Sequence, residues 1–206
     1  MKKKKITLII IILLLVVLLS VGGYFGYKAV SKNKDAIGGT VVVDKIDKYG
    51  YTLEEDAPKV YKDLFKELQK VLNKDEVDYE EYAKLVAQMT VVDFYNLDNK
   101  VSKNDIGGVQ FIYSPYKENF VLEASETVYK YIEHNLYKDR TQQLPVVDSS
   151  YVDSIKTEKY QYKKIKDDEA YSVNVKLTYK KDMGYPSNVV VKLLHNDGKL
   201  EVYYMK

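Results

Sequence analysis

The 206-residue sequence contains no cysteine, two histidines and one arginine. Without cysteine, the chain cannot form disulfides, cysteine-ligated zinc sites, a thiol nucleophile or a lipid-modified N-terminal cysteine. The two histidines, His134 and His195, lie far apart in the sequence and make a poor metal-binding set. The hydrolase motif GxSxG and the zinc motif HExxH are also absent. We therefore expect no catalytic residue, no metal and no cofactor, and we do not expect an enzyme.

One long apolar segment is present near the start, where residues 6–27 contain no charged side chain. As a helix this segment would be about 33 Å long, enough to cross a hydrocarbon core of about 30 Å. It ends with Tyr24, Phe25 and Tyr27, as an interfacial aromatic belt would. A cleaved signal peptide is the alternative, but its apolar region is normally shorter and precedes a small-residue cleavage site. The sequence favours an uncleaved transmembrane anchor.

The charges around this segment predict its orientation. Lys2 to Lys5 precede it directly, which places the N-terminus in the cytoplasm by the positive-inside rule. We therefore expect a single-pass protein of the plasma membrane whose C-terminal domain lies outside the cytoplasm. The expected segments are a basic tail (1–5), a bilayer-spanning anchor (6–27), a stalk (28–51) and an extracytoplasmic domain (52–206).

The exported part has a different charge balance from the whole chain. Seven of the 32 basic residues lie at or before Lys34, which leaves 25 against 30 acidic residues in the remainder. Such a mildly acidic, evenly mixed domain has no basic stripe for phosphates. Nucleic acid is therefore not an expected partner.

Apolar residues at three- and four-residue spacing predict three helices in the first half of the exported part. These helices are expected over residues 53–73, from about 78 towards 97, and over 114–134. Thr52 with Glu55 fits a capping box for the first helix. Ser114 followed by Pro115 fits the start of the third.

After Leu144 the apolar period changes from 3.6 to 2, most clearly in "YSVNVKLTY". Strands are predicted over residues 151–165, 171–179, 187–195 and 199–205. Asp197-Gly198 is a strong hairpin signal between the last two. The predicted fold class is α+β, with three helices packed on a four-stranded antiparallel sheet in meander order.

An anchor followed by helices and then a curved antiparallel sheet resembles the NTF2-like superfamily, whose sheet and helices form a cone. More narrowly, the chain resembles bitopic members that serve as scaffold subunits in bacterial secretion and conjugation systems. The stretches "YGYTLEEDAPKVYKDLFKELQKVL" and "VVDFYNLDNKVSKNDIGGVQFIYS" are similar to uncharacterised membrane proteins of low-GC Gram-positive bacteria. Lysine supplies 31 of the 32 basic residues and tyrosine is abundant, which fits such a source. The resemblance implies an NTF2-like domain that acts as a scaffold.

The stretch "DFYNLDNKVSKNDIGGVQFIYS", residues 93–114, combines three aspartates with a glycine pair. Read as a calcium loop from Asp98, it places Lys100 and Lys103 where oxygen ligands or glycine are needed. It also lacks the glycine spacing of phosphate-binding loops. We interpret Gly107-Gly108 as a turn that needs unusual backbone angles.

A pocket is the remaining functional reading of this stretch. Enzymes of the NTF2-like superfamily use an acid and tyrosines inside the cone, so the resemblance implies Asp93 as a candidate carboxylate and Tyr95 and Tyr131 as candidate donors. The alternative for Asp93 is a capping role or an ion pair with lysine. A small-molecule-binding or isomerase-like domain near Asp93 is therefore the second functional hypothesis.

The leading hypothesis is a membrane-anchored extracytoplasmic binding or scaffold domain. Its expected partners are the bilayer, through residues 6–27, and other membrane or cell-envelope proteins; a homo-oligomer is left open. Tyrosines are abundant in the predicted sheet and are favoured at interfaces, so an outward-facing cluster would indicate a partner surface or a glycan site. The sheet tyrosines are Tyr160, Tyr162, Tyr171, Tyr179, Tyr203 and Tyr204.

Overall fold

The computed structural model describes residues 41–163 and 165–206, and residues 42–206 form one compact unit. The predicted tail, the anchor and the stalk as far as residue 40 lie outside the described residues. Among the residues that are described, no helix has both the length and the apolar character needed to cross a membrane.

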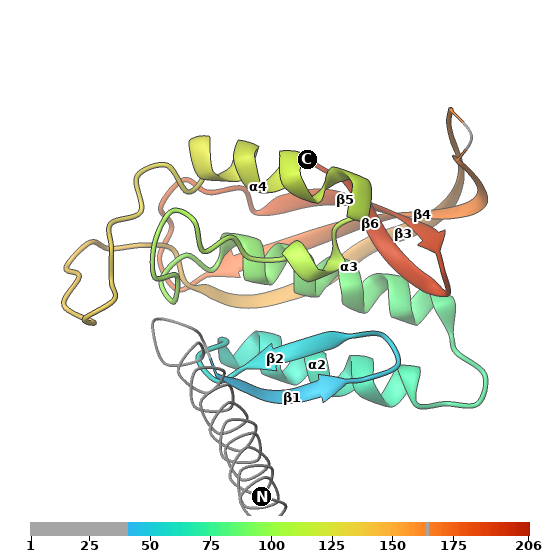
Figure 1. Cartoon of the computed structure of the whole chain (residues 1–206), viewed down its shortest axis with the longest axis horizontal. Helices are drawn as coiled ribbons and strands as arrows, with labels where there is room; N and C mark the ends of the chain where they lie inside the picture. The colour runs from blue at the N-terminus through green and yellow to red at the C-terminus, as the bar shows by residue number, and fades with distance from the viewer. Residues whose placement is uncertain (1–40, 164) are drawn as a thin grey trace, which may run out of the picture. The chain divides into compact units, whose positions relative to one another are not determined.

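The unit has an α+β fold, as predicted, with a hairpin, three α-helices and a four-stranded sheet among its described residues (Figure 1). The α-helices are α2 (Lys59–Leu72), α3 (Tyr79–Tyr95) and α4 (Lys117–Glu126). The hairpin consists of β1 (Val42–Ile46) and β2 (Tyr51–Glu54), and the sheet of β3 (Val147–Tyr162), β4 (Ile165–Tyr179), β5 (Asn188–Asn196) and β6 (Lys199–Met205). Two short 3₁₀ helices, η1 (Val109–Phe111) and η2 (Ser114–Tyr116), precede α4.

The sheet has the strand order β3-β4-β5-β6, which confirms the predicted antiparallel meander. Its core face carries alternate apolar residues such as Val173 and Val175 of β4, paired with Val191 and Val189 of β5. The predicted Asp197 hairpin is also present: Asp197 and Gly198 have φ angles of 48° and 77°. Two successive positive φ angles are those of a type I′ turn, whose twist matches that of the flanking strands.

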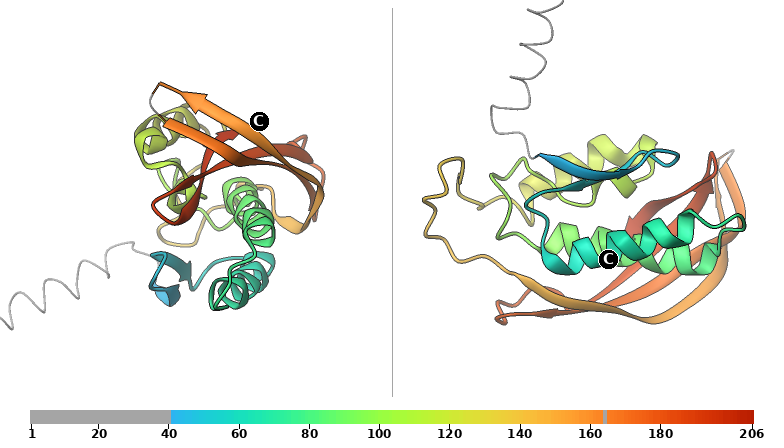
Figure 2. Two further views of the ribbon diagram at one scale, coloured as in Figure 1. Left: turned by 90° about the vertical axis from the view of Figure 1, so that its right-hand side faces the viewer. Right: turned by 90° about the horizontal axis from the view of Figure 1, so that it is seen from below.

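Helix α3 is the centre of the domain and lies between the sheet and α2 (Figure 2). The strands curl around it, and the β1-β2 hairpin lies beside α2. Asp78 caps α3 as expected, because its carboxylate accepts a hydrogen bond from the backbone N–H of Glu81 at 3.0 Å. Buried residues occur all round α3, including Tyr82, Val86 and Val91, since both of its sides are covered. The helices are therefore layered, with α3 against the sheet and α2 on its outer side.

The start of the first predicted helix was wrong. Thr52 does not cap a helix but lies in β2, where Gln110 donates a hydrogen bond to its carbonyl and accepts one from its N–H. Helix α2 begins only at Lys59, after Pro58. Proline disfavours helical angles in the residue before it, Ala57, and Pro58 is itself extended, so the helix cannot begin earlier. Within the segment expected as the stalk, Val42–Ile46 form β1, residues 47–50 form a turn and Tyr51 begins β2.

The end of the third predicted helix was also wrong, because α4 stops at Glu126 rather than near His134. The phenol of Tyr129 is buried, donates to the carbonyl of Phe94 at 2.7 Å and accepts from the N–H of Gly107 at 3.1 Å. These contacts with distant segments require the chain to leave the helix. A tertiary interaction therefore overrides a helical sequence pattern here.

The single arginine holds the loop that follows α4. The guanidinium of Arg140 donates to the backbone carbonyls of Lys100 at 2.8 Å, Asp98 at 2.6 Å and Glu133 at 3.2 Å. Asn135 adds a bond from its N–H to the carbonyl of Val101 at 2.8 Å. One side chain thus joins the loop after α4 to the loop after α3.

Candidate functional site

Asp93 lies in the last turn of α3 and uses both of its carboxylate oxygens. One oxygen is 2.6 Å from the ammonium nitrogen of Lys100, and the other accepts the backbone N–H of Gly108 at 2.6 Å. The Lys100 side chain is only 5% exposed and that of Asp93 is 22% exposed. The carboxylate therefore binds the following loop at two points, Lys100 and Gly108. Of the readings considered for Asp93, the ion pair with lysine is the one observed.

The glycine pair lets this loop approach α3 closely. A Cβ atom on Gly107 would lie 2.1 Å from the carbonyl oxygen of Asp93, which no side chain can occupy. Gly108 has a φ of +77°, a conformation that favours glycine. The interpretation of this pair as a turn with unusual backbone angles is confirmed for Gly108, and close packing explains Gly107.

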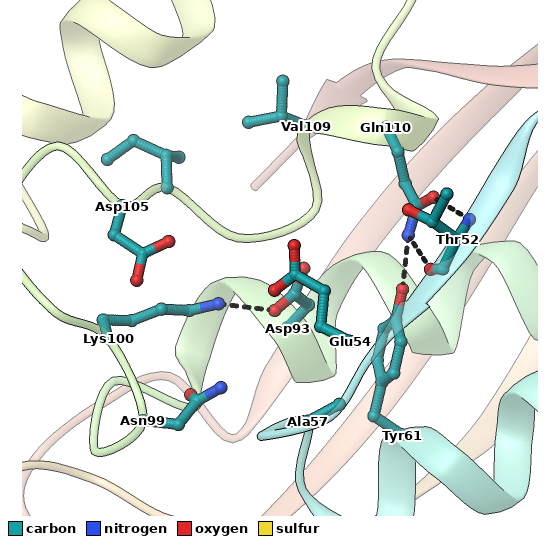
Figure 3. A pocket seen from close by; sticks show the side chains of 11 residues that line it. Thr52, Glu54, Ala57, Tyr61, Asp93, Asn99, Lys100, Asp105, Val109 and Gln110 are labelled. Atoms are coloured by element: carbon teal, nitrogen blue, oxygen red, sulfur yellow. Dashed lines mark hydrogen bonds and ion pairs between the residues drawn. The ribbon is translucent and has the colours of Figure 1, made fainter. Parts of the chain in front are cut away.

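A small polar cavity of about 150 Å³ lies against the Asp93–Lys100 pair (Figure 3). Figure 3 shows Glu54 and Asp105 on the other sides of the Lys100 ammonium group. Burial favours the neutral form of Lys100, but the carboxylates of Asp93, Asp105 and Glu54 outweigh it and raise the pKa of the lysine. Burial also raises the pKa of Glu54. The cavity is thus a place where one buried cation is surrounded by acidic groups.

The far wall of this cavity is closed by neutral hydrogen bonds. The side-chain amide of Gln110 donates to the phenol oxygen of Tyr61 at 2.6 Å and to the carbonyl of Thr52 at 3.1 Å. Burial, with the nearby Asp93, raises the pKa of Tyr61 well above its ordinary value, so the phenol stays neutral. Within the described residues, no group of three or more acidic or histidine side chains has a metal-binding arrangement.

The three residues proposed for a pocket do not converge. Asp93 faces the polar cavity, whereas Tyr95 lines a separate groove on the other side of the loop. Tyr131 is 77% exposed and lines neither hollow. No carboxylate–phenol pair of the kind expected from these three residues is formed.

The groove lined by Tyr95 is the larger of the two hollows, with a volume of about 560 Å³. It runs between α4 and the end of β6 and includes the C-terminal turn of α3. Most of its lining is aromatic or aliphatic: Phe94, Tyr95, Ile112, Tyr116, Phe120, Ala124, Val128, Val202, Tyr203, Tyr204 and Met205. Among the polar lining side chains, Asn119 and Glu123 come from α4, and Thr127 is the residue that directly follows it.

The long β3-β4 hairpin reaches the rim of this groove. The rings of Tyr160 on β3 and Tyr203 on β6 are 4.3 Å apart between centroids, and the hydroxyls of Tyr160 and Tyr116 are 3.3 Å apart. Tyr203 donates to the carboxylate of Glu158 at 3.0 Å, and Lys192 pairs with the same carboxylate at 2.8 Å. Tyrosines from three distant segments therefore form one aromatic rim.

Comparison with known proteins gives no relative: no protein-family model, curated protein or solved structure matches the chain. The candidate site is therefore argued from its own geometry.

Sequence reasoning identified Asp93 and the glycine pair but missed Lys100, Glu54 and Gln110. Lys100 follows Asp93 by seven residues in a loop, and no periodic pattern marks it as buried. The groove was missed because its walls come from segments about 80 residues apart, α4 and β6. The one sequence signal was the density of tyrosine in the predicted strands.

Proposed function

We propose that the protein is a single-pass membrane protein whose extracytoplasmic, NTF2-like domain acts by binding other proteins of the cell envelope, as a scaffold. The observation that carries this proposal is the apolar groove between α4 and β6. Most of its lining atoms belong to aromatic and aliphatic side chains on an open surface. Apolar surface left open in this way is typical of interaction sites.

Three further features support the proposal. The uncharged segment of residues 6–27 supports a membrane anchor, since it is long enough to cross a bilayer. The four-stranded meander that curls around α3 supports an NTF2-like domain. The rim tyrosines Tyr116, Tyr160 and Tyr203 support recognition of a partner, because tyrosine is enriched at protein interfaces.

The alternative, an isomerase-like domain centred on Asp93, has less support. The polar cavity is about 150 Å³, and small-molecule sites usually measure about 300–1,000 Å³. The Asp93 carboxylate is also occupied by Lys100 and Gly108. Each of its two oxygens therefore already accepts a hydrogen bond from the chain itself.

The proposal is tested by photocrosslinking in native membranes. A photoreactive phenylalanine analogue is placed at Tyr204, in the groove, and as a matched control at Lys66, an exposed residue of α2. We expect a defined crosslinked membrane or envelope protein from Tyr204 and none from Lys66. Equal labelling from both positions would contradict a specific binding function.

Topology is tested with reporters fused after Lys206. A phosphatase that is active only outside the cytoplasm should be active, and a fluorescent protein that folds only in the cytoplasm should be dark. The reverse pattern would contradict the orientation and, with it, the extracytoplasmic proposal.

A further inference from the structure

We propose that the groove between α4 and β6 binds an extended peptide segment of the partner protein, which adds as a further strand beside β6. This inference rests on the proposed binding function and specifies what the domain recognises. It follows from the backbone edge of β6, from the apolar walls beside that edge and from the space that α4 leaves.

The outer edge of β6 carries backbone groups that point away from β5. Val190 and Lys206 exchange both of their backbone hydrogen bonds, at 2.7 and 3.0 Å. In an antiparallel pair such bonded residues alternate with residues whose N–H and C=O point the other way. Met205, between Tyr204 and Lys206, therefore directs its N–H and C=O away from β5, towards the open edge of the sheet.

At one point this edge already pairs with another segment of the chain. The N–H of Tyr113 donates to the carbonyl of Val202 at 2.8 Å, and Ile112 forms a parallel bridge with Val202. The chain then turns away at Ser114 into η2 and α4. The row begun by Ile112 and Tyr113 thus stops before Met205, and an added strand would continue it.

The side chains that line the groove determine which residues an added strand can place there. Successive side chains of a strand point to opposite faces, so every second residue of an added strand would enter the groove. There it would meet the rings of Phe94, Tyr95 and Phe120. The single charged side chain among the groove's described lining residues is Glu123 of α4. The occupant that fits is a segment whose alternate, groove-facing residues are apolar or, opposite Glu123, basic.

The space beside β6 favours a single peptide over a second copy of this chain. Direct pairing of two β6 edges would bring a second α4 into the space beside the first, because α4 borders this edge in each copy. One extended segment needs only the width of a strand, about 4.8 Å from β6. Strand addition beside a helix is a known mode of peptide recognition.

The experiment uses the full-length chain in detergent and a phage library of random peptides about six residues long, the usual strand length. We expect enriched peptides with apolar residues at alternate positions. A synthetic copy of the best peptide should lose binding when the amides on one strand edge are N-methylated. Failure to enrich any peptide, or unchanged binding on N-methylation at either edge, would overturn the inference.

Two pairs of variants locate the binding. Met205→Pro removes the outward N–H, and Met205→Ala keeps it while also losing the side chain; we expect the proline variant to bind the peptide at least about tenfold more weakly than the alanine variant. Asn119→Trp fills the groove, whereas Glu118→Trp adds the same ring on an exposed neighbour that does not line it. Only the first tryptophan should block the peptide, and circular dichroism shows that each variant is folded. Equal binding within both pairs would overturn the inference.

The crosslink at Tyr204 separates this inference from the proposed function. If Tyr204 captures an envelope protein while no peptide is enriched, strand addition is wrong and the binding function stands. If neither assay gives a partner, both are wrong. If size-exclusion chromatography with light scattering shows a dimer that is lost in Asn119→Trp, the occupant is a second copy, which overturns the peptide proposal.

Discussion

The polar cavity beside Asp93 and the groove between α4 and β6 differ in how their polar groups are paired. The charged groups of Asp93 and Lys100 are largely buried and are paired with partners in the same chain. Between α4 and β6, apolar rings and an unpaired stretch of strand edge are left open. The comparison teaches that the most chemically reactive residue types mark the site that holds the fold together. The recognition surface that we propose lies where apolar side chains are left open.

The largest effect is expected from breaking the buried ion pair. Lys100→Met leaves the carboxylate of Asp93 in a partly buried site without its cation, and should lower the free energy of unfolding by about 3–5 kcal/mol. Urea denaturation measures this loss. The matched control is Lys103→Met, which removes the exposed pair with Glu126 and should cost at most about 1 kcal/mol. Equal losses would mean that the pair at Asp93 is no more than a surface contact.

A somewhat smaller effect is expected from the close approach of the loop to α3. Gly107→Ala places a methyl group against the carbonyl of Asp93 and should cost about 2–3 kcal/mol. Gly184→Ala is the control, since its Cβ would meet nothing within 4 Å and only its φ of +76° is unfavourable, at about 1 kcal/mol. Chemical denaturation compares the two. A Gly107→Ala variant as stable as the control would show that the loop moves away from the helix without cost.

An intermediate case is Asp167, whose carboxylate accepts hydrogen bonds from the backbone and ring nitrogens of His195 at 2.7 and 2.9 Å. Burial favours its neutral form, but the N–H groups of His195 and Glu169 outweigh this and lower the pKa of Asp167. A lowered pKa gives stability that is present above the unfolded pKa of about 4 and is lost as pH falls through the folded value.

The matching measurement is the pH dependence of unfolding in Asp167→Asn. Above about pH 5 the variant should be less stable than the parent chain, and the difference should shrink as the pH falls below about 4. Thermal unfolding at several pH values follows this change. A difference that stays constant with pH would show that the carboxylate charge contributes nothing.

The smallest effect on stability is expected in the groove. Tyr204 is 42% exposed, so Tyr204→Ala should change the free energy of unfolding by no more than about 0.5 kcal/mol. The same variant should weaken the crosslinking or peptide binding proposed for the groove, because a tyrosine that lines it is lost. Measuring both quantities on one variant separates recognition from folding. A large loss of stability with unchanged binding would reverse the distinction between the two hollows.

Most of the regular structure could be predicted from the sequence, because α2, β4 and β5 carry clear apolar periods, whereas α3 is buried all round. The predictions failed where distant contacts decide the local structure. Thr52 resembles a helix cap but pairs with Gln110, and α4 ends early because Tyr129 bonds to Phe94 and Gly107.

The candidate site was less predictable than the fold. Asp93 was identified, and an ion pair with a lysine was one alternative. The sequence did not indicate which lysine, because Lys100 lies in a loop without periodicity. Tyr95 is close to Asp93 in sequence but lines the groove instead of the polar cavity. Tyr131 follows α4 and faces the solvent. A groove between α4 and β6 depends on the packing of distant segments, which periodicity does not encode.

The position of Arg140 has a consequence for how sequences of this kind can drift. The other 31 of the 32 lysine and arginine residues of the chain are lysine. At position 140 the planar guanidinium donates to three carbonyls at once, which a lysine ammonium on a flexible stem cannot reproduce in the same geometry. In related sequences, arginine should therefore persist at this position even where lysine has taken all the others.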